Sequence, residues 1–333
     1  MNSVFNKRNC IRAASAGVLI ILFFTAGLLT GCEANKSQSY SNVVNAQTSD
    51  NFQETNKKEG QRSVNDSAVN DSKIMESFQA LIENSNALPE LIRFIDSNIS
   101  AVSKENATLM IDKLEEMHNK FLPQMDEKFY KDGDLQVKMS EAFMSGFDIS
   151  KIYEVEDAEL KELLSEVRDS GYKVETAEGM FFPVIDYEFY KKYSSYVTPD
   201  MKEYIDIMAV ESNNTPAKNA ALVIDWNEVS KRAVNQEKFI SKYGDSIKID
   251  DVKWLYKRYV TFTLFGLNNT PLFSYETKVI DQGAKEAYMS ILESGEESGY
   301  IKIISDFMEL LKENAYKLTD EVNKYREVII ENM

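Results

Sequence analysis

Residues 103–121, which read SKENATLMIDKLEEMHNKF, set the pattern for most of this chain. Apolar side chains recur there every three or four residues, at Ala107, Met110, Ile111, Leu114, Met117 and Phe121. Because an α-helix completes a turn in about 3.6 residues, this spacing places them all on one helix face. Ser103 stands just before the run and can cap the helix N-terminus with its hydroxyl. The stretch therefore predicts an amphipathic helix with one buried face.

The same helical period returns along the chain. It is present in residues 157–168, 226–243, 250–267 and 303–329. Proline and glycine interrupt helices, and the 333 residues include only 6 prolines and 13 glycines. We therefore predict a mainly α fold built from one or more multi-helix domains.

One region departs from the helical period. Residues 172–176 alternate between polar and apolar side chains, residues 177–179 suit a turn, and residues 180–185 form a second extended run. This order predicts a small β-hairpin or an extended insertion near residues 172–185. A two-stranded sheet is only marginally stable alone, so the hairpin must pack on helices.

The N-terminus has the three parts of an export signal. Lys7, Arg8 and Arg12 precede an apolar run over residues 18–28, and that run ends at Leu29-Thr30-Gly31-Cys32. The apolar run is short for a membrane-spanning helix and ends in small residues. The last four residues closely resemble the lipobox of bacterial membrane lipoproteins, in which an aliphatic, a small and a Gly or Ala residue precede a cysteine.

The lipobox resemblance implies a lipid anchor. In such lipoproteins a diacylglyceryl group is attached to the cysteine thiol and signal peptidase II cuts before it, so cleavage here falls between Gly31 and Cys32. Acyl chains such as palmitate hold the mature protein at the extracytoplasmic face of the cell membrane, each buried methylene contributing roughly 0.8 kcal/mol. The alternative is an ordinary signal peptide, or an uncleaved anchor helix, with an incidental cysteine.

The resemblance and the composition together divide the chain into four segments. Residues 1–31 are the expected signal peptide. Residues 32–72 are rich in Ser, Asn, Gln, Lys and Glu without an apolar period, so we expect a lipidated, disordered tether. Residues 73–170 are an N-terminal helical region and residues 171–333 a mainly helical region with the hairpin, forming either one domain or two.

Charge and residue usage exclude several function classes. The net charge is −16, and the basic leader makes the remainder more acidic still, which disfavours nucleic-acid binding and attachment to anionic lipids without a covalent anchor. Cys10 lies in the leader and Cys32 is the expected lipidation site, so no thiol remains for catalysis, a disulfide or a metal. His118, the one histidine, flanks an apolar helix face, and we predict it to be half-buried or on the surface. We predict no metal site, because neither a cysteine nor a second histidine remains as a ligand. We predict no cofactor, because no glycine-rich phosphate loop for a nucleotide or dinucleotide is present.

A cluster of carboxylates and aromatic rings is the one candidate ligand surface. It comprises Glu178, Asp186, Tyr187, Glu188, Asp225 and Trp226. Paired carboxylates beside aromatic rings are typical of glycoside hydrolases, and Tyr and Trp are common at binding interfaces. The alternative is chance, since the chain contains 54 acidic residues, 17 tyrosines and 18 phenylalanines.

Three functions follow from these patterns. The leading one is a non-enzymatic lipoprotein that binds an envelope protein, a peptide or a cell-wall glycan, because no catalytic motif is present. The second is a hydrolase that acts on cell-wall glycan through Glu178 and Asp186. The third is a helical structural spacer.

A short motif also occurs twice. Asn213-Asn214-Thr215-Pro216 and Asn268-Asn269-Thr270-Pro271 each follow a helical stretch. One explanation is two helix–loop–helix corners, in which Asn closes one helix and Thr and Pro begin the next. The other explanation is duplication of a helical hairpin.

Overall fold

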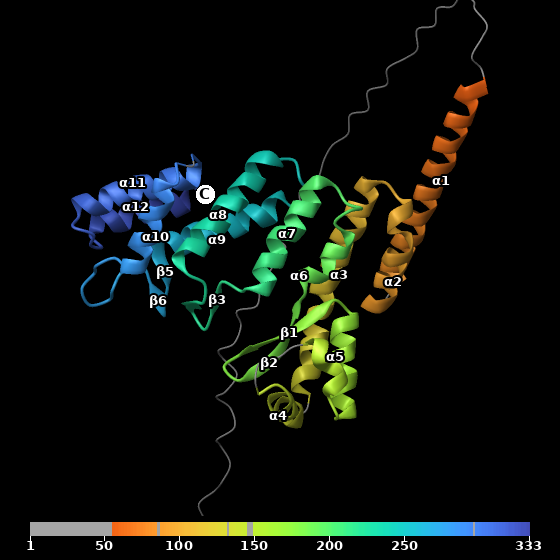
Figure 1. Ribbon diagram of the computed structural model, residues 1–333, viewed down its shortest axis with the longest axis horizontal. Coiled ribbons are helices and arrows are strands. Elements are labelled where there is room, and N and C mark those ends of the chain that lie inside the picture. Colours follow the sequence, from red (N-terminus) through yellow and green to blue (C-terminus); the bar gives the residue numbers. More distant parts are fainter. Residues whose placement is uncertain (1–54, 85–86, 132, 145–148, 296) are drawn as a thin grey trace, which may run out of the picture. The chain divides into compact units, whose positions relative to one another are not determined.

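The structure, a computed structural model, describes residues 55–84, 87–131, 133–144, 149–295 and 297–333 (Figure 1). The expected signal peptide, its cleavage site at Gly31 and Cys32, and residues 33–54 lie outside the described residues. Within the described ranges, no helix is both long enough and apolar enough to cross a membrane.

Helices dominate the described chain, which confirms the predicted mainly α fold. The α-helices are α1 (Thr55–Asn84), α2 (Leu88–Asn98), α3 (Lys104–Tyr130), α4 (Gly133–Ala142), α5 (Ala158–Asp169), α6 (Tyr187–Tyr190), α7 (Pro199–Asn213), α8 (Trp226–Lys242), α9 (Ile249–Phe265), α10 (Gln282–Glu293), α11 (Gly299–Glu313) and α12 (Asp320–Glu331). Short 3-10 helices are η1 (Ile99–Ala101), η2 (Ile149–Glu154) and η3 (Lys191–Tyr193). The strands form three antiparallel pairs: β1 (Tyr172–Ala177) with β2 (Met180–Ile185), β3 (Ala217–Lys218) with β4 (Ala221–Leu222), and β5 (Gly266–Leu267) with β6 (Thr270–Pro271).

Helix α3 has the amphipathic form that its sequence predicts. The hydroxyl of Ser103 accepts a hydrogen bond from the backbone N–H of Asn106 at 3.2 Å, which caps the helix. Met110, Ile111 and Leu114 are each at most 1% exposed. Burial of these side chains contributes roughly 1.5–3 kcal/mol each, so packing rather than propensity stabilises the helix.

Helix α1 corrects the predicted boundary of the tether. We predicted disorder through residue 72, but the helix begins at Thr55. Its C-terminal half packs against the core through Met75, Phe78 and Leu81. Once that half is docked, each further residue adds one backbone hydrogen bond without a new nucleation cost, so the helix extends into a polar sequence.

The hairpin β1–β2 confirms the predicted insertion near residues 172–185. Tyr172 pairs with Ile185 at its base, and Glu178 and Gly179 form the turn with positive φ angles of 53° and 78°. The outer edge of β2 is closed by the side chain of Gln136 on α4. The amide of Gln136 accepts from Phe181 N at 2.8 Å and donates to Phe181 O at 2.9 Å, as a neighbouring strand would.

The repeated Asn-Asn-Thr-Pro motif occupies two different structures, so the explanation by two helix–loop–helix corners is wrong. Asn213 is the last residue of α7, whereas Asn268 and Asn269 form the turn between β5 and β6. In neither place does the motif lead directly into a helix. Instead the turns of β3–β4 and β5–β6 dock on each other, with Asn269 N donating to Ala220 O at 2.8 Å.

Helices α8 to α12 pack together at the C-terminal end of the chain, and α7 packs on α8 (Figure 1). A continuous set of buried apolar side chains runs from Phe78 to Val322, and residues 55–333 form one compact unit. The two helical regions that meet at residues 170 and 171 are therefore parts of a single domain.

Candidate functional site

The structure does not bring the carboxylates of the predicted ligand surface together. Glu178 is exposed at the tip of the β1–β2 hairpin, whereas Asp186 follows the far end of β2. Six residues of extended strand span roughly 20 Å. Glycoside hydrolysis requires two carboxyl groups about 5–9.5 Å apart, so this pair does not have the geometry of the hydrolase hypothesis.

Asp186, Tyr187 and Glu188, at the start of α6, all have structural partners within the protein. Asp186 caps the helix by accepting from Glu188 N at 3.1 Å, and burial raises the pKa of its carboxyl although Lys173 lowers it. Glu188 accepts from the side-chain amide of Asn213 at 2.9 Å. Tyr187 is buried, so its ring offers no face to a ligand.

Asp225 and Trp226 belong to a different part of the structure. Asp225 caps α8 by accepting from Glu228 N at 2.8 Å. Trp226 is 8% exposed, and its indole N–H donates to Asp281 Oδ1 at 2.9 Å. Asp281 in turn caps α10 at Ala284 N, so these contacts fix the junction of α8 and α10. The six predicted residues therefore lie in three places: Glu178 at the hairpin tip, Asp186, Tyr187 and Glu188 at α6, and Asp225 and Trp226 at the start of α8.

A buried polar network joins α3 to α6, α7 and α9. The carboxylate of Glu115 accepts from the hydroxyls of Tyr187 and Tyr204, and its other oxygen lies 2.7 Å from Lys248 Nζ. Lys248 Nζ also lies 2.5 Å from Asp112 Oδ1. Burial lowers the pKa of Lys248, but Glu115 and Asp112 raise it by more, so it stays charged. None of these side chains lines either pocket described below, and we assign the network a structural role.

His118 is fully buried, which corrects the predicted half-buried or surface position. Its Nδ1 lies 2.5 Å from the hydroxyl of Tyr190 and its Nε2 lies 2.7 Å from the carbonyl of Ser170. A neutral ring satisfies both contacts, because Nε2–H donates to the carbonyl and the Tyr190 hydroxyl donates to Nδ1. Burial lowers the pKa of His118 to about 4, against the opposing effect of the Ser170 carbonyl. With both nitrogens occupied inside the core, His118 is not available for catalysis.

A pocket of about 370 Å³ lies among the C-terminal elements, where β5 and β6 meet the segment before α10. Its lining residues are Ala220, Phe265, Gly266, Leu267, Asn268, Pro271, Phe273, Ser274, Tyr275, Lys278, Leu318 and Arg326. The volume falls within the roughly 300–1,000 Å³ typical of small-molecule sites. We call these residues the cationic pocket, because its lining includes two basic residues and no acidic one.

Arg326 forms one wall of the cationic pocket. Its guanidinium lies 4.3 Å from the ring centroid of Phe265, and its Nη2 donates to Asn323 Oδ1 at 2.6 Å. Burial lowers the pKa of Arg326. Within the described ranges, neither Arg326 nor Lys278 forms an ion pair with a carboxylate. In a chain of net charge −16, two cations without acidic partners in one pocket favour an anionic ligand.

Strained backbone surrounds the cationic pocket. Six described non-glycine residues have positive φ, and five of them lie in the loops that border it: Asn219, Ala220, Lys278, Ala315 and Tyr316. Left-handed backbone costs roughly 1–2 kcal/mol for a residue with a Cβ. Such conformations gather at functional sites, where the surrounding contacts hold them. Here the loops are held by backbone hydrogen bonds, including Leu318 N to Lys278 O at 2.8 Å.

Gly266 lines the pocket at the junction of α9 and β5. Its φ of 70° lies in the region that favours glycine, and a Cβ there would lie 2.3 Å from the carbonyl of Thr270. Only glycine lets the chain turn from α9 directly into β5, which places Phe265 and Leu267 in the lining.

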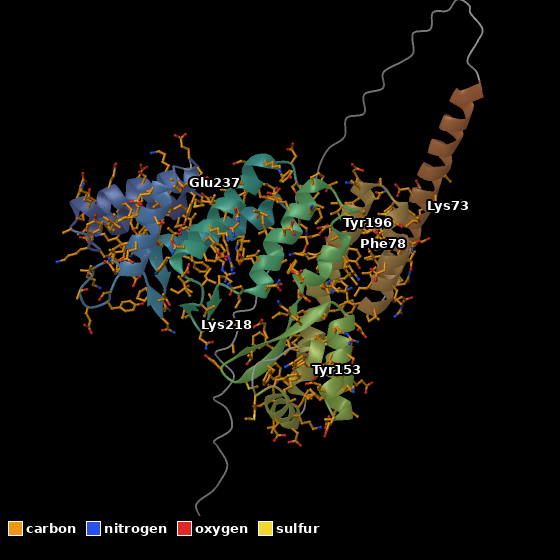
Figure 2. The ribbon with its side chains drawn as sticks, viewed as in Figure 1. Lys73, Phe78, Tyr153, Tyr196, Lys218 and Glu237 are labelled. Carbon is orange, nitrogen blue, oxygen red and sulfur yellow. The ribbon has the colours of Figure 1, made fainter. Side chains whose placement is uncertain are left out.

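Lys218 connects the neighbouring hairpins. Its ammonium reaches from β3 to β1, where it lies 2.8 Å from Glu175 Oε2 and 3.4 Å from the carbonyl of Thr176 (Figure 2). Both side chains are partly exposed, so the pair contributes at most about 1 kcal/mol and mainly fixes the position of β3.

Little in the sequence indicates the cationic pocket. Its residues come from separate segments between Ala220 and Arg326, and Lys278 and Arg326 are ordinary basic residues in the sequence. Gly266 beside the Asn-Asn turn was the one local sign of an unusual backbone. In the described part of the chain, no group of three or more His, Cys, Asp or Glu side chains is arranged to hold a metal ion.

Known proteins give no indication of the function of this chain. No protein-family model matches the chain, and no curated protein or solved structure is significantly similar to it.

Proposed function

We propose that this protein is a lipid-anchored extracytoplasmic lipoprotein that binds a carboxylate-bearing ligand, of peptide or cell-wall glycan origin, without chemically changing it. The observation that carries the binding role is the cationic pocket, with Lys278 and Arg326 and no acidic residue in its lining. The partly exposed ring of Phe265 and the exposed ring of Tyr275 supply surface for the body of the ligand.

The overall acidity does not prevent this binding. A carboxylate about 4 Å from one cation gains on the order of 4 kcal/mol at the effective dielectric constant of a protein surface. Charges on the rest of the molecule act from farther away, and salt screens them beyond about 8 Å at physiological ionic strength. The two local cations therefore determine the sign of the charge that the pocket accepts.

Arg326→Gln is expected to weaken binding of N-acetyl-L-phenylalanine at least tenfold, because the substitution replaces the cation with a shorter, neutral amide. Isothermal titration of the full chain measures the change. Lys278→Gln is a second variant, at an exposed position where the fold is unaffected, and is expected to weaken binding several-fold.

Lys302→Gln is the matched control for these variants. Lys302 is an exposed basic residue on α11 that pairs with Asp306 and lies outside the pocket. Its substitution should leave the affinity unchanged. If the pocket variants and this control bind equally well, the pocket does not recognise the carboxylate. A spacer protein would bind the probe in none of these forms.

The lipid anchor is proposed from the export signal and the lipobox residues Leu29-Thr30-Gly31-Cys32. Cys32→Ser removes the thiol that would receive the diacylglyceryl group, so incorporation of a tagged fatty acid should disappear. The protein should then be released or remain as an uncleaved precursor. Cys10→Ser is the control, because Cys10 precedes the apolar run and its loss should leave labelling intact. Label that persists in the Cys32 variant would contradict the anchor.

A further inference from the structure

A second, smaller pocket of about 240 Å³ lies between α7 and α8. Its lining residues are Glu203, Asp206, Ile207, Val210, Glu211, Arg232, Asn235, Gln236 and Lys238. None of them belongs to the cationic pocket. We call this the α7–α8 pocket. Its volume suits a ligand smaller than the drug-sized molecules that occupy roughly 300–1,000 Å³.

Two deeply buried side chains of this pocket have polar atoms without partners. Arg232 is 4% exposed and Gln236 is 1% exposed. Arg232 Nη2 and both amide atoms of Gln236 have no hydrogen-bond partner among the described residues. The only other atom of this kind in the described ranges is Ser194 Oγ. Buried polar groups in native proteins are almost always paired, so this concentration indicates that an external group completes them.

The rest of the Arg232 side chain is firmly held. Its Nε donates to Glu228 Oε1 at 2.8 Å, and its Nη1 donates to the carbonyl of Asn214 at 2.9 Å and to the hydroxyl of Tyr259 at 3.1 Å. These contacts fix the guanidinium, and the carboxylates of Glu228 and Glu211 offset its charge. Nη2 is therefore left as a donor for a neutral acceptor such as a carbonyl oxygen.

The free amide of Gln236 can pair with a peptide group. One acceptor and one donor are open on the same side chain, which is the pairing that Gln136 already makes with the backbone of Phe181 at 2.8 and 2.9 Å. A second peptide group could bond Gln236 in the same way, with its carbonyl also accepting from Arg232 Nη2.

The charged residues around the α7–α8 pocket indicate the charge of its ligand. Three acidic and two basic residues line it. Glu211 and Glu228 offset the charge of Arg232, and Glu203 pairs with Lys242 at 3.2 Å. Asp206, which is exposed at the rim, has no ion-pair partner in the described part of the chain. The pocket therefore favours a neutral or cationic ligand over an anionic one.

We propose that the α7–α8 pocket binds a peptide segment of neutral or positive charge, with a peptide group held by Gln236 and Arg232. The peptide N–H donates to Gln236 Oε1, and the peptide carbonyl accepts from Gln236 Nε2 and Arg232 Nη2. These atoms are closed to bulk water in the unliganded protein, so binding requires a shift of the side chains that cover them.

The test titrates the full chain with two blocked dipeptides, N-acetyl-glycyl-lysine N-methylamide and N-acetyl-glycyl-glutamate N-methylamide, followed by protein NMR. The lysine peptide is expected to bind at least threefold more tightly. Gln236→Met keeps the length of the side chain but removes both polar atoms, and it should weaken binding of the lysine peptide at least tenfold. Gln79→Met, at an exposed position on α1, should leave binding unchanged.

Unfolding of the Gln236→Met protein in urea completes the test. Because the amide has no partner inside the protein, the midpoint should stay the same or rise. A clearly lower midpoint would show that the amide is satisfied within the fold, which overturns the proposal. Absence of saturable binding of either peptide, equal binding by the Met variant, or preference for the glutamate peptide would also overturn it. Arg326→Gln should not affect this site, so the two pockets can fail separately.

Discussion

Gly171→Ala is expected to lower the free energy of unfolding by about 4 kcal/mol. Gly171 has a φ of 73°, where a residue with a Cβ is strained by roughly 1–2 kcal/mol. The new Cβ would also lie 2.7 Å from His118 Nε2 and 3.2 Å from Phe189 Cδ1. His118 cannot move aside cheaply, because both its nitrogens are hydrogen-bonded in the core, and loss of its bond to Ser170 adds about 1–3 kcal/mol.

Gly179→Ala is the matched control, measured in the same urea unfolding experiment. Gly179 has a φ of 78°, yet no atom lies within 4 Å of the position that its Cβ would occupy. The Gly179→Ala protein should therefore lose only about 1–2 kcal/mol of the free energy of unfolding, which is the strain of left-handed backbone. The difference in free energy of unfolding between the two variants reports the packing around His118. Equal losses would show that the ring is not fixed where the structure places it.

The stability of the protein is expected to fall as the pH drops from about 6.5 toward 4, because His118 stays neutral in the folded state. Its pKa is lowered from 6.5 to about 4 by burial. Between these values the unfolded chain binds a proton that the folded protein does not, so acid favours unfolding. The contribution of His118 to the free energy of unfolding is complete well above pH 6.5. About 2 kcal/mol of it is lost by pH 5, and about 3 kcal/mol by pH 4.

The pH effect is isolated by comparison with His118→Gln, since many carboxylates titrate in the same range. The variant lacks the imidazole and should be less stable at pH 7.5. The difference between the two proteins in free energy of unfolding should then shrink by about 2 kcal/mol at pH 5. A difference that is independent of pH would mean that the folded protein accepts the proton, and that His118 is not buried as described.

The period of the apolar residues was sufficient to predict most helices and the one long hairpin. Met110, Ile111 and Leu114 are buried as their spacing requires, and the turn at Glu178 and Gly179 is where the sequence placed it. The start of α1 was missed because helix extension into a polar segment depends on docking of Phe78, which is a tertiary contact.

The candidate site could not be predicted because it depends on contacts between distant residues. Glu178 and Asp186 are close in sequence but separated by an extended strand, whereas Lys278 and Arg326 are far apart in sequence and line one pocket. The repeated Asn-Asn-Thr-Pro motif also shows that local sequence alone does not determine the local structure. Identical local sequences end a helix in one place and form a hairpin turn in the other, because the surrounding packing decides between conformations that cost similar free energies.

Burial of His118 was missed for a related reason. The helix periodicity placed it at the flank of the apolar face, where either water or a second element could cover it. The residues that cover it, Tyr172, Phe189 and Tyr190, come from the hairpin and α6, far along the chain. The Tyr190 hydroxyl and the carbonyl of Ser170 pair with the two ring nitrogens, which makes burial of a polar ring possible.

The most direct test of the proposed function compares two probes on the unmodified full chain. N-acetyl-L-phenylalanine and N-acetyl-L-phenylalaninamide have nearly the same shape, but only the first carries a carboxylate. If Lys278 and Arg326 make the pocket an anion site, isothermal titration should give the carboxylate at least tenfold higher affinity, and added salt should reduce that preference. Equal affinities for the two probes, or preference for the amide, would contradict the proposal.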